Sequence, residues 1–245
     1  MQVTALYRHP IKSHGREALD RVRLERDQSM PFDRRWAVAH EAARMEGASW
    51  APCANFSRGA KAPSLMAINA TLDETTERVT LTHPERDEIT LHPVRDADAL
   101  INWVTPLVPQ DRALPARVFE LEERGFTDSN YASVSLCNVA SHHAVEALSQ
   151  TALSPLRWRG NIWFEGVAAW EEFDWIDRDL RIGEATIRIK ERIVRCLATT
   201  ANPETGIRDV DTLSSLNMLD HQDFGIYAEV IESGDISLGD ELELI

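Results

Sequence analysis

Cysteine is scarce in this chain of 245 residues, and its three copies lie far apart, at Cys53, Cys137 and Cys196. No C-x-x-C pair or Cys/His cluster occurs, which argues against a structural zinc site. The odd number argues against a disulfide scaffold as well. The sequence also lacks a long apolar run, so no membrane span is expected. Motifs of the types G-x-S-x-G, G-x-x-x-x-G-K and H-E-x-x-H are absent, which leaves their chemistries without a candidate.

Basic residues are also in the minority, with 26 Lys and Arg against 40 Asp and Glu and a formal charge of −14. This balance argues against nucleic acid or an anionic membrane surface as a general partner, but it is compatible with a local basic pocket for a small anion. The first ten residues show neither the basic segment nor the apolar core of a secretory signal. We therefore expect a cytoplasmic protein.

Short stretches of alternating apolar and polar residues dominate the chain and predict β-strands. The predicted strands are Gln2–Tyr7, Leu19–Arg26, Phe32–His40, Ser64–Leu72, Arg78–Thr82, Glu88–His92, Arg117–Leu121, Ser133–Leu136, Ile187–Val194, Gly225–Ile231, Ile236–Leu238 and Glu241–Leu244. Helices are predicted at Ala97–Leu107 and Asn138–Ser149. Many short strands with few helices indicate a mixed, β-rich fold that contains a barrel. The apolar pattern thins before residue 127, and we place a domain boundary there, giving domains 1–122 and 123–245.

Cys196 follows the alternating segment that ends at Val194 and precedes a loop rich in Pro and Gly. A rigid strand would hold its thiol at the mouth of that loop. The flanking Arg192 and Arg195 would lower the thiol pKa by favouring the thiolate, which is the form that binds metals or attacks electrophiles. The alternative is that Cys196 is a small buried apolar residue, as most single cysteines are.

Three groups of hydrogen-bond donors are candidates for anion binding. Lys12-Ser13 offers an ammonium and a hydroxyl beside a glycine, Arg34-Arg35 opens a strand, and Arg157, Arg159 and Asn161 would face the same way on an extended segment. Only one of the two adjacent arginines at 34 and 35 can point into a site. Solvated turns and strand edges contain the same residue types, so each group also has a structural explanation. On the helix Asn138–Ser149, an apolar face is predicted from Val139, His143, Ala147 and Leu148.

Taken together, segments along nearly the whole chain resemble the MOSC family, in the branch that carries an extra N-terminal β-barrel and includes the amidoxime-reducing components. The matching segments are His9-Pro10-Ile11-Lys12-Ser13, Phe32-Asp33-Arg34-Arg35-Trp36, Pro63-Ser64-Leu65, Arg159-Gly160-Asn161-Ile162, Trp170-Glu171-Glu172, Arg195-Cys196 through Pro203-Glu204-Thr205-Gly206, Phe224-Gly225-Ile226-Tyr227 and Gly239-Asp240. They occur in the order in which the family has them. The resemblance implies an N-terminal MOSC-type β-barrel domain followed by a MOSC domain.

The resemblance further implies a molybdenum-cofactor (molybdopterin) oxidoreductase that reduces N-hydroxylated small molecules with electrons from a separate donor protein, and no requirement for pyridoxal phosphate. Cys196 would be the metal ligand and catalytic residue. The implied cofactor-binding residues are Lys12, Ser13, Arg34, Arg58, Arg159, Asn161 and Thr200. A soft thiolate ligand suits the metal, and an anionic cofactor suits a basic pocket.

The chain also departs from the family. Gly160 replaces a proline, Asn202 replaces an aspartate, and the segment Glu41–Ala62, which we expect to be irregular, lacks a Thr-Ala-Arg run for which Arg58 and Lys61 are the candidate replacements. Two other functions remain open. The chain would be either a carrier that holds the cofactor or a Cys196 persulfide, or a binding domain in which Cys196 is only packed.

Overall fold

The computed structural model describes residues 1–45, 49–122 and 124–245, and most of its regular elements are short strands. The strands are β1 (Gln2–Arg8), β2 (Glu17–Leu19), β3 (Arg21–Leu24), β4 (Trp36–His40), β5 (Asn69–Asp73), β6 (Arg78–His83), β7 (Arg86–Leu91), β8 (Pro115–Glu120), β9 (Val134–Asn138), β10 (Ile162–Glu165), β11 (Asp179–Ile182), β12 (Ala185–Val194), β13 (Asp223–Glu232), β14 (Gly234–Ser237) and β15 (Leu242–Leu244). The α-helices are α1 (Ala97–Val104), α2 (Val139–Ser149) and α3 (Thr212–Asn217). Short 3₁₀ helices are η1 (Cys53–Asn55), η2 (Pro63–Ala67), η3 (Thr105–Leu107), η4 (Pro155–Trp158), η5 (Glu171–Trp175) and η6 (Leu197–Thr200). The predicted mixed, β-rich fold is confirmed.

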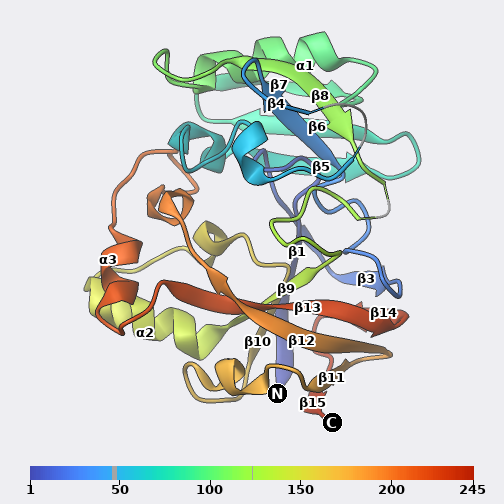
Figure 1. Cartoon of the computed structure of the whole chain (residues 1–245), viewed down its shortest axis with the longest axis vertical. Coiled ribbons are helices and arrows are strands. Elements are labelled where there is room, and N and C mark those ends of the chain that lie inside the picture. Colours follow the sequence, from blue (N-terminus) through green and yellow to red (C-terminus); the bar gives the residue numbers. More distant parts are fainter. Residues whose placement is uncertain (46–48, 123) are drawn as a thin grey trace.

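An eight-stranded sheet in the order β15-β11-β12-β13-β9-β10-β1-β2 curls through the lower part of the molecule (Figure 1). The pair β9–β10 is parallel, and the long strands β12 and β13 are antiparallel. Alternate side chains of these strands, among them Phe164, Ile187 and Ile226, are buried in the main core. The sheet is thus a half-barrel whose inner face is apolar, as period-two alternation requires.

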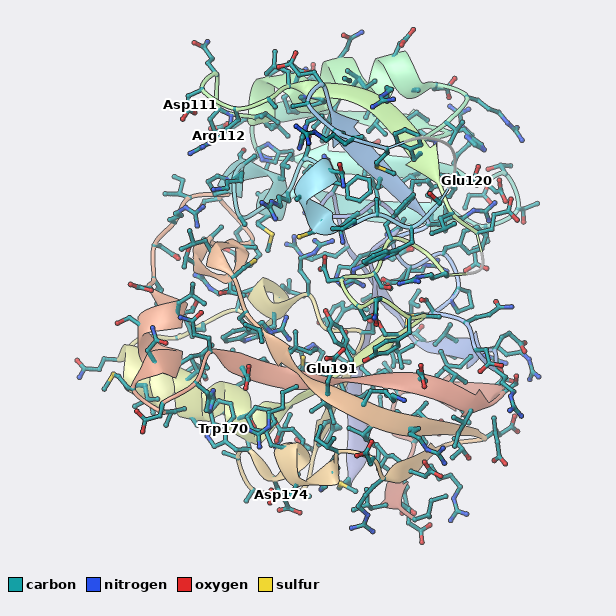
Figure 2. All side chains as sticks on the ribbon, viewed as in Figure 1. Asp111, Arg112, Glu120, Trp170, Asp174 and Glu191 are labelled. Atoms are coloured by element: carbon teal, nitrogen blue, oxygen red, sulfur yellow. The ribbon has the colours of Figure 1, made fainter. Side chains whose placement is uncertain are left out.

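The upper part of the molecule contains the three-stranded sheet β5-β6-β7, the pair β4–β8 and helix α1 (Figure 1). A second core of buried residues, including Trp36, Leu65, Val79 and Leu100, fills the space between them. Figure 2 shows the same separation, with Glu120 of β8 high in the view and Glu191 of β12 below it. Each part therefore has its own core.

The two parts of the chain are interwoven at the N-terminus. Strand β1 pairs with β10, and β3 pairs with β14 near the C-terminus. Strand β1 is thus part of the large sheet, which also contains the strands of the second half, and it holds the residues that follow it against that sheet. Strand β3 forms a separate two-stranded sheet with β14. The domain boundary after residue 122 stays a prediction, and residue 123 and residues 46–48 lie outside the described part of the chain.

Three of the predicted elements were wrong in part. The predicted strand Phe32–His40 begins only at Trp36, because Phe32 and Arg34 have left-handed φ angles of 60° and 54°. The predicted strand Ser64–Leu72 begins as η2 instead, because Pro63 occupies the first position of a helical turn, and only Asn69–Asp73 forms a strand. On α2, the buried residues are Ser141, His142 and Val145, whereas His143 is exposed. The packed face of α2 is therefore partly polar, which an apolar pattern cannot reveal.

No helix in residues 1–45, 49–122 and 124–245 is long and apolar enough to cross a membrane.

Gly225 of β13 gives a test of the sheet packing. Its φ is +73°, and a Cβ atom there would lie 2.5 Å from the carbonyl oxygen of Leu136 on β9. Gly225→Ala should lower the free energy of unfolding by about 2–5 kcal/mol, because left-handed backbone strain adds to a steric clash. Gly239→Ala is the matched control, since Gly239 has a φ of +85° but its Cβ would meet only a side-chain atom at 3.6 Å. The control should lose about 1–2 kcal/mol. Equal losses in denaturant unfolding would contradict this account.

Candidate functional site

Cys196 lies directly after β12, as its sequence context predicts. Its backbone is extended, with φ −125° and ψ 176°, and it occupies the N-cap position of η6. The backbone oxygen of Cys196 accepts hydrogen bonds from the amide and the hydroxyl of Thr199, each at 3.1 Å. Its side chain is exposed and lines a cavity of about 250 Å³. The alternative of a buried, merely packed Cys196 is therefore wrong.

The arginines next to Cys196 point elsewhere. The Arg195 guanidinium donates to the carbonyl oxygens of Trp158 and Phe224 at 2.6 and 2.8 Å. The guanidinium carbon of Arg192 lies 4.4 Å from the ring centroid of Phe173. Both side chains thus brace aromatic neighbours, and the expectation that they activate the Cys196 thiol has no support in these contacts.

The loop after Cys196 is fixed to the first half of the chain. Arg16, which is buried, donates to the carbonyl oxygen of Pro203 at 2.8 Å and to that of Met66 at 2.7 Å. Arg208 donates to the carbonyl oxygens of Leu197 and Ala60. These guanidinium groups each bridge the two halves, so the loop beside the thiol is held from both sides.

Several basic residues line the same cavity, and they come largely from the segments that follow β1 and precede β4. Lys12, Ser13, Arg34 and Arg159 all line the cavity that Cys196 lines. Ser13, Arg34 and Arg159 have positive φ angles of 62°, 54° and 51°. Such backbone strain in ordinary residues is typical of functional sites. The structure therefore brings four of the predicted anion-binding residues together with the predicted metal ligand.

Arg34 is the one of the two adjacent arginines that faces the site, and Arg35 instead pairs with Glu120 at 2.7 Å. Arg34 donates to Asp33 and, at 3.1 Å, to the carbonyl oxygen of Arg159. Burial alone would raise the pKa of Asp33, but Arg34 and the hydrogen bonds from His9 hold it below its ordinary value. The Asp33 carboxylate is therefore charged and keeps Arg34 in place.

Among the described residues, Arg159 has no such acidic partner. Its Nη2 atom donates to the carbonyl oxygen of Gly15 at 3.2 Å, while its buried Nη1 atom has no hydrogen-bond partner among the described residues. Burial, followed by repulsion from Arg34 and Arg16, lowers the pKa of Arg159 to about 9. A buried guanidinium nitrogen without a partner costs free energy unless an anion accepts a hydrogen bond from it.

Two other predicted site residues, Asn161 and Thr200, do not line the cavity. Asn161 is buried and accepts at Oδ1 from the amide and hydroxyl of Ser135, at 3.1 and 2.8 Å, while its amide donates to the carbonyl oxygen of Tyr7. Thr200 is buried as well, donates to the carbonyl oxygen of Leu197 and accepts from Arg208. Both residues fix the strands and loop around the cavity. Arg58 does line it, and donates to Cys53 Sγ at 3.0 Å.

The segment with Arg157, Arg159 and Asn161 is not extended. It forms η4 followed by the left-handed residue Arg159, so the predicted common face is wrong. Arg157 and Arg159 still both line the cavity. Arg157 is buried and forms a bidentate pair with Asp209 at 2.7 and 2.8 Å.

Sequence reasoning missed Asp128 and Tyr227, which also line the cavity. Lys12, whose side chain is buried, donates to Asp128 at 2.6 Å and to the carbonyl oxygen of Phe126 at 2.7 Å. Burial raises the pKa of Tyr227, and the carboxylate of Asp128 raises it further. Tyr227 belongs to the quoted segment Phe224–Tyr227, whereas no local pattern marks Asp128.

Chemically, the cavity combines an accessible thiol with several cations and few compensating acids. A thiolate binds soft metals, and guanidinium and ammonium groups bind phosphate or other oxyanions. A ligand that carries both a soft metal and an anionic group would suit the thiol and the cations of this cavity together.

The Lys12–Asp128 pair leads to a prediction about pH. Burial alone would raise the pKa of Asp128, but Lys12 and the neighbouring arginines lower it. Asp128→Asn should lower the free energy of unfolding by about 1–2 kcal/mol at pH 7, a modest loss because the Asp128 side chain is half exposed. Since the folded pKa is depressed, this stabilisation is present above the unfolded value of about 4 and is lost as the pH falls through the folded value.

Denaturant unfolding at pH 7, 5, 4 and 3.5 would measure the effect, with the difference between wild type and variant shrinking only below about pH 4. Asp174→Asn is the control, because the exposed Asp174 has no ion pair within the described ranges (Figure 2). A difference that stays constant into the acid range would contradict the assignment.

Comparison with known proteins gives a family for each half of the chain. Residues 1–111 match the MOSC N-terminal beta barrel domain, and residues 123–243 match the MOSC domain. The human mitochondrial amidoxime reducing component 2 is 34% identical over 95 residues, and its counterpart from Macaca fascicularis matches to the same degree. Each match covers 34% of this chain and 28% of the relative's length.

Solved structures with a similar arrangement include the YuaD protein from Bacillus subtilis, at 11% identity and a TM-score of 0.48 over 100% of this chain and 96% of that one. YiiM from Geobacillus stearothermophilus is similar at 13% identity and a TM-score of 0.35, over 46% of this chain and 53% of its own. The two domain matches account for nearly the whole sequence. The chain belongs to the MOSC family, as a MOSC domain protein with an N-terminal MOSC-type β-barrel domain.

Proposed function

We propose that this chain binds a molybdenum cofactor and reduces N-oxygenated small molecules such as amidoximes and hydroxylamines. Family membership and the partial match to mitochondrial amidoxime reducing component 2 support this proposal. The observation that carries it is the shared cavity, which the exposed Cys196 lines together with Lys12, Arg34 and Arg159.

The residues of the cavity fit such a cofactor. Its phosphate would give the unpartnered Nη1 atom of Arg159 the acceptor that no described residue provides. The same anion would offset the repulsion between Arg159 and Arg34, which contributes to the lowered pKa of Arg159. At the other end, thiolate is a ligand type that soft metals prefer. When bound, the cofactor supplies a metal centre that exchanges two electrons with a substrate.

The assigned roles follow from these positions. Cys196 is the protein ligand of the metal, and Lys12, Ser13, Arg34 and Arg159 hold the anionic part of the cofactor. Asn161 and Thr200 act through neighbours, since their side chains hold the segments around the cavity. Arg58 stands at the edge of the cavity beside Cys53, where it would contact the cofactor or a substrate.

A substrate would enter where Cys196 is exposed. The ion pair of Lys12 with Asp128 lies on the cavity wall, where it keeps the Lys12 ammonium in place. Electrons would come from a separate donor protein that approaches this same opening. The cytoplasmic location expected from the sequence stays a prediction.

A second candidate function is a carrier that holds the cofactor, or a persulfide on Cys196, for delivery to another enzyme. The exposure of the Cys196 side chain favours it, because a sulfur or cofactor that is handed on must be reachable by the receiving protein. A carrier would contain the cofactor or the persulfide but would show no turnover.

Metal analysis separates these functions. Protein purified from a cofactor-competent host should contain molybdenum and pterin and should reduce benzamidoxime with an artificial donor. Cys196→Ser should lower that activity by more than about 100-fold, since even the outer partners of a metal ligand are worth about 10–100-fold. Arg159→Gln should weaken cofactor retention by about 10–100-fold, the value of a hydrogen bond to a charged group.

Arg188→Gln is the matched control, because Arg188 lies on β12 but is half exposed and pairs with Asp179. It should keep both cofactor and activity. Protein that lacks molybdenum and pterin would refute cofactor binding, and full activity in Cys196→Ser would refute the ligand role. Cofactor without turnover, or a sulfur that cyanide releases from Cys196, would favour the carrier.

A further inference from the structure

A second cavity, of about 190 Å³, lies in the first half of the chain beside the end of β4. Its polar lining consists of His40, Ser57, Arg58, Lys61 and Arg112, and no carboxylate lines it among the described residues. The volume is several times the roughly 10–15 Å³ that one water molecule needs, so a group the size of phosphate can be accommodated. In a protein with a formal charge of −14, a cavity whose charged lining residues are all basic is unexpected.

Two polar atoms in this cavity lack a partner. Ser57 is only 6% exposed, and its hydroxyl makes no hydrogen bond with any described residue. His40 uses Nε2 to bond the carbonyl oxygen of Ala54 at 2.8 Å, which leaves its buried Nδ1 atom without a partner. A buried hydroxyl that is left unpaired costs free energy, so these atoms are positioned for a ligand that can both accept and donate hydrogen bonds.

The cations around these atoms are only weakly compensated. Lys61 is exposed and has no ion pair within the described ranges, and Arg112 meets only the exposed Asp111, at 3.6 Å (Figure 2). Arg58 donates to the sulfur of Cys53 and has no carboxylate partner among the described residues. Three positive side chains from two segments therefore line the same cavity as the unpartnered hydroxyl of Ser57.

We propose that this cavity is a second anion site and that its ligand carries a phosphate group. Phosphate oxygens would accept from Ser57, Arg58 and Lys61, and a protonated phosphate oxygen can donate to Nδ1 of His40. A carboxylate has no proton to offer that nitrogen at neutral pH, so phosphate fits the set of groups better. The proposal does not depend on the function proposed for the first cavity.

Arg58 connects the two cavities, because it lines both of them. A phosphate in the second cavity would compete with Cys53 for the Arg58 guanidinium. Phosphate binding would therefore change the surroundings of the Cys53 thiol on the side of the first cavity.

Titration of the purified protein with inorganic phosphate at constant ionic strength tests the proposal by calorimetry and by thermal unfolding. Wild type should bind phosphate and unfold at a higher temperature in its presence. Ser57→Ala should bind about tenfold more weakly, the value of a hydrogen bond to a charged group, and Lys61→Gln should bind about two- to fivefold more weakly. Without phosphate, Ser57→Ala should be as stable as wild type or more stable, since its hydroxyl has no partner to lose.

Two further variants locate the bound anion. Lys190→Gln removes one positive charge at β12 and should leave binding unchanged. Arg159→Gln removes a cation that lines only the first cavity of the two, so the phosphate binding that Ser57→Ala weakens should persist in it. Glycerol 3-phosphate is the second titrant. If it binds more tightly than inorganic phosphate, the ligand is a phosphate monoester, and if inorganic phosphate binds more tightly, the ligand is free phosphate. Failure of both to bind overturns the proposal, as does binding that Arg159→Gln abolishes and Ser57→Ala retains.

Discussion

Repulsion between buried like charges governs the arrangement of the main cavity. Lys12, Arg34 and Arg159 all face it, and each is withdrawn at least partly from solvent. Lys12 pairs with Asp128, which also lines the cavity, and Arg34 pairs with the buried Asp33. Arg159 has no carboxylate partner among the described residues, and repulsion from Arg34 contributes to the lowering of its pKa. Three cations this close together are stable only where the rest of the fold holds them in place or a bound anion offsets their repulsion.

The fold enforces it through β1. Because β1 pairs with β10 inside the large sheet, the residues that follow it, from Lys12 to Gly15, are delivered to the edge of the second half. The carbonyl oxygen of Gly15 then accepts from Arg159. Cys196 arrives at the same place along β12, from the other side of the sheet. One interwoven strand thus places the cations and the thiol in a single cavity.

Much of this could be predicted from local sequence. The strand before Cys196 follows from period-two alternation, which is a local property. The orientation of Arg34 does not, because Arg34 has a left-handed φ of 54° and lies in a turn before β4. The pairing of Lys12 with Asp128 could not be predicted, because the two residues are 116 positions apart and meet only through the tertiary fold. The packed face of α2 was mispredicted for a related reason. Ser141 is buried there because it donates to the buried carboxylate of Glu172, a partner 31 residues away.

Two of the three departures from the family pattern, Gly160 and Asn202, have physical explanations in this chain. A Cβ atom at position 160 would lie 2.5 Å from the sulfur of Cys137, so a proline there would collide with a neighbour that this sequence places in the core. Asn202 donates through its amide to Asp209 at 2.8 Å, and Asp209 in turn holds Arg157.

An aspartate at position 202 would oppose the charge of Asp209 instead of donating to it, and would weaken the bidentate hold on Arg157. Arg157 lines the cavity and also donates to the carbonyl oxygen of Thr200 at 3.2 Å, four residues beyond the thiol. The neutral amide of Asn202 therefore belongs to the network that fixes the Cys196 loop. In this chain each of these departures fits the residue that it contacts, Cys137 for Gly160 and Asp209 for Asn202.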